Sequence, residues 1–316
     1  MPPFQPAYLA LLESGELAQR VTQAYEQLKQ CNLCAWKCRV NRRENRRGVC
    51  RTGENPLVSS YFAHMGEENC LRGWRGSGTI FFANCNMRCT FCQNYEISAE
   101  GRGTEVSPEA LADMMLHLQA AGCHNINFVS PSHVVAPIIK AVWLAAQEGL
   151  RLPLVYNTGG YDSLEALALL DGVIDIYMPD MKFADTKIAL QYSRIPDYPR
   201  HNRRAVREMH RQVGDLQLDP ETGLAQRGLL VRHLILPGGL AGTRKTMQFL
   251  ARKVSPETFV NLMGQYMPAY RAPGMDGPIS RPVNRAEVLE ALQLAQEAGL
   301  HRFDPSITLW VDRALR

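Results

Sequence analysis

The sequence lacks any long apolar run. None reaches the roughly 20 residues that a membrane-spanning helix needs, although 46% of the 316 residues are hydrophobic. The N-terminus, MPPFQPAYLALLESGELAQR, also lacks the basic start and the small-residue cleavage site of a secretory signal, and Glu13 and Glu16 interrupt it early. We therefore expect a globular protein of the cytoplasm with no membrane partner, long enough to bury a sizeable core.

A large charge imbalance is missing as well. The formal net charge is only +4, and much of the basic excess lies in one segment, RVNRRENRRGVCR at residues 39–51. A chain with this balance is not a polycation directed at nucleic acid. We expect these basic side chains to offset the charge of the nearby cysteine thiolates, with a solvated face or a protein or RNA contact as the alternatives.

Cysteines, in contrast, are plentiful and unevenly placed. Nine are present, of which only Cys70 and Cys123 stand alone; the others form a group of four at positions 31, 34, 38 and 50 and a group of three at positions 85, 89 and 92. A reducing cytosol argues against a disulfide framework, and the close spacing favours metal binding.

From about residue 78 the chain alternates short β-branched or aromatic runs with longer segments of helical period. The expected strands are 79–83, 125–129, 153–157, 174–178, 228–236 and 259–263. Most are continuously apolar, as strands covered on both faces are. Six strand–helix units in succession predict a parallel sheet, either doubly wound or curved into a partial barrel. We expect the α/β fold of a partial (β/α)6 TIM-type barrel.

Helix boundaries follow from capping residues. Helices are expected to begin at Ser107-Pro108-Glu109, at Asp162-Ser163 and at Ser255-Pro256-Glu257, and to stop near Gly122, Gly149 and Gly299. A further helix is expected from about Ala7 to Lys29. We predict two domains: residues 1–60 as a helical, cysteine-rich appendage that binds metal, and residues 61–316 as the barrel.

The group of three cysteines lies in FFANCNMRCTFCQNYEIS, on the loop that leaves the first expected strand. The carboxyl ends of parallel strands form the ligand-binding face, so Cys85, Cys89 and Cys92 should lie at the mouth of the barrel. Three thiolates bound to a [4Fe-4S] cluster leave one iron open for an outside ligand. The alternative is a zinc site completed by Cys70, His64 or His133.

The C-x3-C-x2-C loop, with the aromatic Phe91 just before its last cysteine, resembles the signature of the radical S-adenosylmethionine superfamily. The phrases NINFVSPSHVV, VYNTGGYD, IDIYMPDMKF, RHLILPG and VNLMGQYMPAY resemble strands two to six of the pyruvate formate-lyase activating enzymes and of their cysteine-rich PflX-like branch, over about residues 30–285. This resemblance implies that Cys85, Cys89 and Cys92 are the catalytic cysteines. It also implies that S-adenosylmethionine binds the open iron and is cleaved to a 5′-deoxyadenosyl radical.

The resemblance also implies cofactor contacts. PDMK stands where activating enzymes carry Asp-x-Lys, so Asp180 and Lys182 are candidates for the methionine and ribose parts of S-adenosylmethionine. Asn157 and Thr158 of YNTGG should face the same cavity, and Arg232 offers its guanidinium to the carboxylate. The alternative for each is an ordinary buried polar residue or ion pair at a strand end.

The chain departs from the family at strand two. Family members usually carry Gly-Gly-Glu there to bind the cofactor amino group, whereas this chain has VSPSH. Ser130 and Ser132 are our candidates for that contact, through their hydroxyls and backbone carbonyls. His133 remains a polar residue at a helix start in this interpretation.

The group of four cysteines, Cys31, Cys34, Cys38 and Cys50, has C-x2-C-x3-C-x11-C spacing. Four thiolates suit zinc, a rubredoxin-like iron or an auxiliary iron–sulfur cluster, and the Arg residues between them would offset their charge. The alternative is a set of buried cysteines without metal. Cys70 could join either group or line the active site, and Cys123 is expected in the core.

Three function classes follow. The first is a radical enzyme that abstracts hydrogen from a substrate, which could be a partner protein with a reactive glycine, a small molecule, a peptide or an RNA; it would need a reductant such as flavodoxin or ferredoxin. The second is a zinc-ribbon protein that binds nucleic acid. The third is a two-cluster electron-transfer protein, against which the open iron argues. We favour the first.

Overall fold

The computed structural model describes residues 4–313. The helices are α1 (Tyr8–Glu13), α2 (Glu16–Gln27), α3 (Asn69–Arg72), α4 (Tyr95–Ser98), α5 (Pro108–Ala120), α6 (Val135–Gln147), α7 (Leu164–Leu170), α8 (Thr186–Ser193), α9 (Tyr198–Val213), α10 (Thr243–Lys253), α11 (Arg285–Glu297) and α12 (Ser306–Arg313). The strands are β1 (Leu57–His64), β2 (Ser77–Phe82), β3 (Thr104–Glu105), β4 (Ile126–Val129), β5 (Leu154–Thr158), β6 (Ile176–Pro179), β7 (Gln217–Leu218), β8 (Ala225–Leu234) and β9 (Phe259–Met263).

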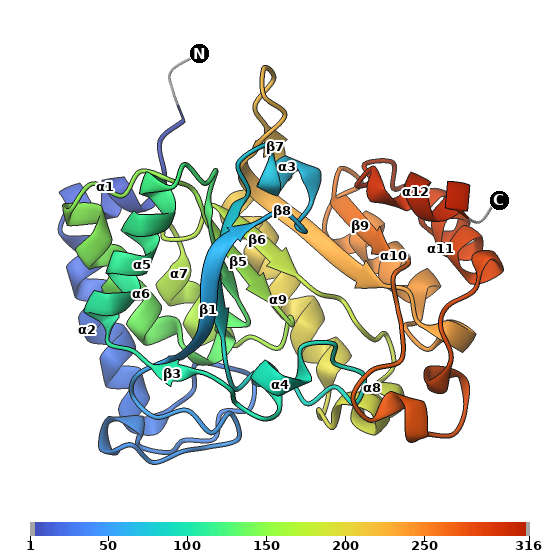
Figure 1. The fold of residues 1–316 in the computed structure, drawn as a ribbon, viewed down its shortest axis with the longest axis horizontal. Coiled ribbons are helices and arrows are strands. Elements are labelled where there is room, and N and C mark those ends of the chain that lie inside the picture. The colour runs from blue at the N-terminus through green and yellow to red at the C-terminus, as the bar shows by residue number, and fades with distance from the viewer. Residues whose placement is uncertain (1–3, 314–316) are drawn as a thin grey trace.

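All six predicted strands are present, as β2, β4, β5, β6, β8 and β9. They pair in parallel in this chain order, so each strand–helix unit adds its strand to the same edge of the sheet. Within residues 4–313 no strand pairing joins β9 back to β1 or β2. The curved sheet with helices outside it is therefore a barrel that stays open on one side (Figure 1).

The sequence analysis missed β1. This strand runs antiparallel to β2, from Val58 opposite Phe82 to His64 opposite Ser77, and a bulge shifts its register between Val58 and Ser60. Its burial falls from Val58, which is buried, to three exposed residues from Tyr61 to Ala63, so it has neither the continuous apolar run nor the alternation that marks a strand. Because β1 is antiparallel to β2, the residues that follow β1 lie near the amino ends of the parallel strands.

Most predicted helix boundaries are confirmed. Ser107 and Ser163 accept backbone N–H bonds at the starts of α5 and α7, and the three predicted terminal glycines all have positive φ. The predicted helix at Ser255-Pro256-Glu257 is wrong: these residues form a turn directly before β9. There Ser255 Oγ accepts the Glu257 N–H at 3.1 Å, because only one residue separates Glu257 from the strand.

The N-terminal segment packs on the barrel. The predicted helix from Ala7 to Lys29 is broken at Gly15, where φ is +76°, into α1 and α2. Leu17 and Leu28 of this segment join the hydrophobic cluster that contains α6, and α2 packs against this mostly apolar helix. The predicted boundary between residues 60 and 61 falls within β1, and the division into two domains stays a prediction. None of the described helices is long and apolar enough to cross a membrane.

Candidate active site

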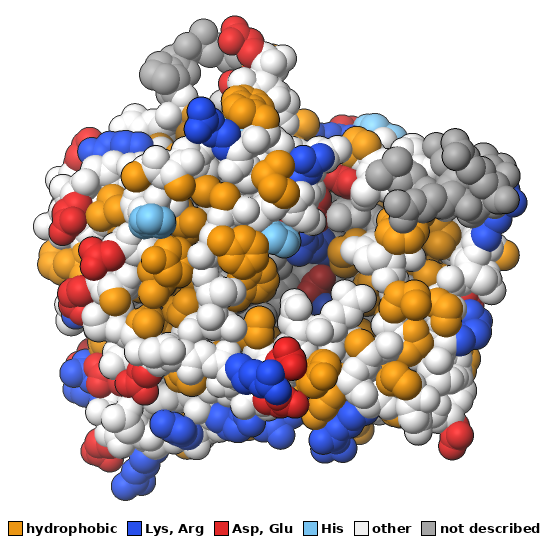
Figure 2. All heavy atoms as spheres, viewed as in Figure 1, with side chains coloured by type: hydrophobic (Ala, Val, Ile, Leu, Met, Phe, Trp, Pro, Cys, Tyr) orange, Lys and Arg blue, Asp and Glu red, His pale blue; other side chains and the backbone are white. Residues whose placement is uncertain are grey.

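A cavity of about 660 Å³ lies inside the open barrel. Its lining includes nine of the predicted site residues: Cys85, Cys89, Phe91, Cys92, Ser130, Asn157, Asp180, Lys182 and Arg232. Figure 2 shows the molecule hollowed near its centre, with basic and acidic side chains visible inside the hollow. The parallel strands bring these nine residues from five separate segments of the chain to this one space, as expected for their carboxyl ends.

The cysteine loop is held by backbone contacts on both sides. Asn84, with φ of +64°, turns the chain out of β2, and its N–H bonds to the Ile97 carbonyl at 3.1 Å. Further along, the Thr90 N–H bonds to the Tyr192 carbonyl at 2.8 Å, which ties the loop to the end of α8. The loop is therefore anchored independently of any bound group.

The three thiols each have a polar neighbour. Ser193 Oγ donates to Cys89 Sγ at 3.0 Å, Cys92 Sγ lies 3.2 Å from Ser98 Oγ, and Cys85 Sγ accepts the Met87 N–H at 3.4 Å. Burial raises the pKa of the Cys89 thiol to about 12, and nearby Lys182 opposes part of this rise. Hydrogen-bond donors and a cation favour the thiolate form that iron binds.

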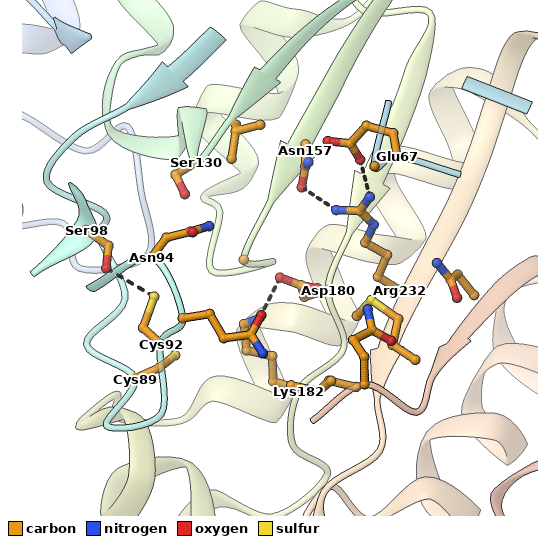
Figure 3. Close-up of a pocket in the computed structure, with 18 of the residues that line it drawn as sticks. Glu67, Cys89, Cys92, Asn94, Ser98, Ser130, Asn157, Asp180, Lys182 and Arg232 are labelled. Atoms are coloured by element: carbon orange, nitrogen blue, oxygen red, sulfur yellow. Dashed lines mark hydrogen bonds and ion pairs between the residues drawn. The ribbon is translucent and has the colours of Figure 1, made fainter. Parts of the chain in front are cut away.

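Lys182 is the cation beside this loop. Its Nζ lies 2.6 Å from Asp180 Oδ2, and both residues belong to the segment that follows β6. Burial alone would lower the pKa of Lys182, but Asp180 and the neighbouring cysteines raise it overall, so the side chain stays charged. In Figure 3 the Asp180–Lys182 pair lies between the cysteines and the Arg232 region.

The donor set fits a three-cysteine iron–sulfur cluster: three thiols on one loop face one cavity, with a buried cation nearby. Within the described part of the chain, no three His, Cys, Asp or Glu side chains converge closely enough to hold a single metal ion. A cluster spaces its ligating sulfurs more widely than a single ion does. Three cysteines on one loop would leave one of the four irons of such a cluster without a protein ligand, as an open site requires.

The proposed zinc ligands lie elsewhere. Cys70 is buried in an apolar cluster at the barrel floor with Leu71, and His133 Nε2 donates to the Ala83 carbonyl at 2.9 Å while the ring is buried. His64 lines the cavity but contacts Glu67, with 3.2 Å between Nδ1 and Oε1. Cys123 belongs to the hydrophobic core, which confirms its prediction.

Ser130 and Ser132 separate in the structure. Ser130 lines the cavity with φ of +61°, and its N–H bonds to the Asn157 carbonyl at 2.9 Å. Ser132 and Thr158 lie outside that lining; their hydroxyls are 2.8 Å apart, and Thr158 donates to Asp162 Oδ2 at 2.7 Å. These two residues form a buried polar network behind the strand ends, which matches the structural alternative stated for Thr158.

Arg232 is already paired. Its Nε and Nη2 donate to the two oxygens of Glu68, each at 2.7 Å, and Nη2 also contacts Glu67. Burial alone would lower the pKa of Arg232, but the two glutamates raise it well above the usual range. The guanidinium that we assigned to a cofactor carboxylate is therefore engaged by carboxylates of the chain itself (Figure 3).

Glu67 and Glu68 are charged cavity-lining residues that the sequence analysis missed. They follow β1 and enter the cavity from the amino ends of the strands. Burial would raise the pKa of Glu67, but Arg232 and His64 hold it well below its usual range, so this carboxylate is ionised. In the sequence these two consecutive glutamates lie more than 160 residues from Arg232, so no local pattern indicates the pairing.

The four N-terminal cysteines lie in one region beside the cysteine loop. The pKa of Cys34 is raised by burial, by Cys50 and by the other two thiols, so all four are close in space. Backbone N–H groups of Val40 and Val49 oppose the rise in the pKa of Cys38. The sulfurs do not reach single-ion distances within residues 4–313, so metal at Cys31, Cys34, Cys38 and Cys50 stays a prediction.

This region also contacts the site. Trp36 Nε1 donates to the Asn86 carbonyl at 2.8 Å, and Arg88 donates to the Val49 carbonyl at 2.9 Å. Arg42, from the basic run, is fully buried, and its Nη1 donates to the His133 carbonyl at 2.6 Å. Part of the basic run is thus structural and is not a solvated face.

Comparison with known proteins agrees with this geometry. A profile of the radical SAM superfamily matches residues 79–238. The uncharacterized protein MJ0674 of Methanocaldococcus jannaschii is 30% identical over 302 residues, which covers 92% of this chain and 82% of that protein. The chain belongs to the radical SAM superfamily.

Solved structures were also compared. A radical SAM methyltransferase from Sphaerobacter thermophilus has a TM-score of 0.47 at 15% identity, over 74% of this chain and 68% of that one. The FeFe-hydrogenase maturase HydG from Carboxydothermus hydrogenoformans has a TM-score of 0.48 at 14% identity, over 75% and 56%.

Proposed function

We propose that this protein is a radical S-adenosylmethionine enzyme that cleaves the cofactor reductively and abstracts hydrogen from a substrate in the barrel cavity. The observation that carries the proposal is that Cys85, Cys89 and Cys92 face the same cavity as the polar side chains at the strand ends. Membership of the superfamily implies the [4Fe-4S] cluster and S-adenosylmethionine.

Each residue has a distinct role in this proposal. Cys85, Cys89 and Cys92 would hold three irons, which leaves the fourth for the amino and carboxylate groups of S-adenosylmethionine. When bound, the cluster supplies the electron that cleaves the sulfonium to a 5′-deoxyadenosyl radical. Lys182 offsets negative charge beside the thiolates, and Asp180, Asn157 and Ser130 offer oxygen acceptors and amide donors to the bound cofactor.

The hydrogen donor in the proposed reaction could belong to more than one class of substrate. The resemblance to activating enzymes and the PflX-like branch suggests a backbone glycine of a partner protein as the hydrogen donor. A small molecule that binds in the cavity is the other candidate. The proposed reaction, hydrogen abstraction, is the same for both. The enzyme would work in the cytoplasm, with a second metal held by the four N-terminal cysteines.

The test is cofactor cleavage. Protein reconstituted with iron and sulfide without oxygen, then mixed with dithionite and S-adenosylmethionine, should release 5′-deoxyadenosine detectable by mass spectrometry. An intact cluster by electron paramagnetic resonance without any 5′-deoxyadenosine would contradict the proposed reaction and favour the electron-transfer alternative.

A second cavity supports a reductant partner for this enzyme. It has a volume of about 220 Å³, and Cys85 and Cys89 line it from behind the cysteine loop. Four exposed arginines surround it: Arg51, Arg88, Arg194 and Arg271. We propose that an acidic electron donor of the flavodoxin or ferredoxin class docks here, because a positive rim speeds the encounter with an acidic partner.

The pair of substitutions Arg88→Glu and Arg271→Glu tests this docking. We expect flavodoxin-driven cleavage to slow about tenfold at low salt and less at high salt, because rim charges act on the encounter rate. Cleavage driven by dithionite should be unchanged. The matched control is Arg252→Glu with Lys253→Glu, which makes the same charge change in the last turn of α10. An equal slowing of flavodoxin-driven cleavage in this control would contradict a specific docking site.

A further inference from the structure

Arg42 is fully buried, and its contacts within residues 4–313 include no carboxylate. Nε donates to the Gly53 carbonyl at 2.8 Å and Nη1 donates to the His133 carbonyl at 2.6 Å, and both acceptors are neutral. Nη2 is buried as well and has no hydrogen-bond partner among these residues. A buried charge without an opposite charge is unfavourable, so Arg42 requires an anion that these carbonyls do not supply.

The neighbouring ionisable side chains do not supply this anion either. Burial lowers the pKa of His133 to about 3, and the charge of Arg42 adds to the fall, so the ring is neutral. The glutamates of the same segment pair with other arginines, Glu44 with Arg46 at 3.5 Å and Glu54 with Arg43 at 3.2 Å. The charge of Arg42 is therefore left for another group.

The thiols of the four N-terminal cysteines are that group. Arg42 Nη1 donates to Cys31 Sγ at 3.7 Å. Burial raises the pKa of the Cys34 thiol, and the other three thiols raise it further, because four thiolates in one place repel one another. A bound metal removes this repulsion, while four thiolates on zinc or on an iron–sulfur cluster keep a net negative charge. A metal centre would thus provide the anion that Arg42 lacks.

The backbone around these sulfurs fits a thiolate ligand. The N–H groups of Val40 and Val49 bond to the sulfur of Cys38 and favour its charged form against the effect of burial. A Cβ atom added at Gly48 would lie 2.4 Å from Cys38 Sγ, so the chain at this glycine passes directly over the sulfur. The donor set therefore suits a metal held by thiolates.

We propose that the four N-terminal cysteines hold their metal as an anionic thiolate centre, that Arg42 is the counter-cation of this centre, and that Arg42 thereby positions residues 130–133 beside the main cavity. The guanidinium suits this role because it reaches a sulfur while two of its nitrogens stay bonded to backbone carbonyls. Arg42 is a positioning residue and does not touch the cofactor. The proposal rests on the proposed function for the second metal and for the use of the cavity.

The segment that Arg42 holds reaches the cysteine loop. His133 Nε2 donates to the Ala83 carbonyl at 2.9 Å, directly before that loop. Three residues before His133, Ser130 lines the main cavity on the cysteine side (Figure 3). Burial raises the pKa of the Cys85 thiol there, and a hydrogen bond from the Ser130 side chain opposes the rise. Release of the His133 carbonyl by Arg42 would therefore loosen both the segment and the start of the loop.

The first test measures metal retention. It uses the full chain with Cys85, Cys89 and Cys92 all changed to alanine, so that every bound metal belongs to the N-terminal site. The protein is dialysed against increasing EDTA, and zinc and iron are measured by elemental analysis. We expect Arg42→Gln to lose its metal at an EDTA concentration about tenfold lower, as for other residues that support metal ligands. Arg42→Lys, which keeps the charge, should stay close to the parent protein.

The matched control is Arg43→Gln, which makes the same change at the next residue, an arginine in an exposed ion pair with Glu54. Equal metal retention in Arg42→Gln and Arg43→Gln would overturn the proposal. Equal loss in Arg42→Lys and Arg42→Gln would overturn it too, because the charge would then not matter. A parent protein that holds no metal at the four cysteines would also contradict it.

The second test measures amide hydrogen exchange at residues 130–134 in the anaerobically reconstituted full chain. We expect both Arg42→Gln and Cys34→Ala to speed this exchange at least about tenfold, while exchange in α10 stays unchanged. Cys123→Ala, which removes a core thiol away from the metal centre, should match the wild type. Wild-type exchange at residues 130–134 in a metal-depleted Cys34→Ala protein would overturn the link between the centre and the cavity.

The double variant separates pairing with the centre from simple packing. Without the metal, Arg42 would be a buried charge without a partner. Arg42→Gln should therefore lower the unfolding midpoint of the wild type by roughly 5 °C or more, and that of Cys34→Ala by less than half as much. Equal losses in the two backgrounds would overturn the counter-cation role. No measurement here uses a reductant or S-adenosylmethionine, so its failure is distinguishable from a failure of cofactor cleavage.

Discussion

Replacing Cys89 with alanine is expected to reduce the formation of 5′-deoxyadenosine by more than about 100-fold, since even indirect partners of metal ligands contribute 10–100-fold. Cys89 shares the cavity with Cys85 and Cys92, and the Ser193 hydroxyl donates to its sulfur at 3.0 Å. With one of three ligands lost, the cluster cannot be held in the geometry that leaves a single iron open. Mass spectrometry of the nucleoside and iron analysis measure both effects.

Cys123→Ala is the matched control for Cys89. It makes the same truncation at a buried thiol in the hydrophobic core, away from the cavity. We expect Cys123→Ala to cleave S-adenosylmethionine at the wild-type rate. Substantial cleavage by Cys89→Ala would contradict the assignment of the cluster ligands and reopen the electron-transfer alternative.

Cys34→Ala is expected to lower the thermal unfolding midpoint by roughly 10 °C, because structural metal binding contributes directly to folding free energy. Cys34 is buried among the other three N-terminal cysteines, and its backbone bridges to Asp162 after β5. Bound metal should fall by one site, while the cluster at Cys85, Cys89 and Cys92 still forms. Circular dichroism and elemental analysis give the two readouts.

The comparison variant is again Cys123→Ala, which removes one buried sulfur without touching a metal site. If Cys34→Ala is no less stable than Cys123→Ala and keeps the full metal content, the four cysteines are only packed side chains. The identity of the metal, whether zinc, iron or an auxiliary cluster, comes from the same elemental analysis of the wild-type protein.

Much of the fold could be predicted from local patterns. Most of the six parallel strands are short, largely apolar runs buried on both faces, and such runs are visible without tertiary information. Strand β1 was missed because three consecutive residues, Tyr61 to Ala63, are exposed, which removes both the alternation and the continuous apolar run, and because a bulge interrupts its register. The helix predicted at Ser255 failed because a capping serine also stabilises a turn when no room for a helix follows.

The candidate site also contains residues that could be predicted from the sequence and residues that could not. Cys85, Cys89 and Cys92 could be predicted from their close spacing, and Asp180 and Lys182 from the resemblance of PDMK to the Asp-x-Lys of the activating enzymes. The structure places all five at one cavity. Glu67 and Glu68 were missed because their partner, Arg232, is more than 160 residues away. No local pattern reports such a pairing.

The chain alone therefore indicates the superfamily, the barrel and the three-cysteine loop, since each depends on neighbouring residues and on the period of apolar positions. Only the tertiary structure decides that Arg232 is neutralised by two glutamates and that Ser132 and Thr158 lie outside the cavity lining. The physical reason is that charge balance in a buried space is a property of side chains brought together from distant segments, and sequence spacing does not contain that information.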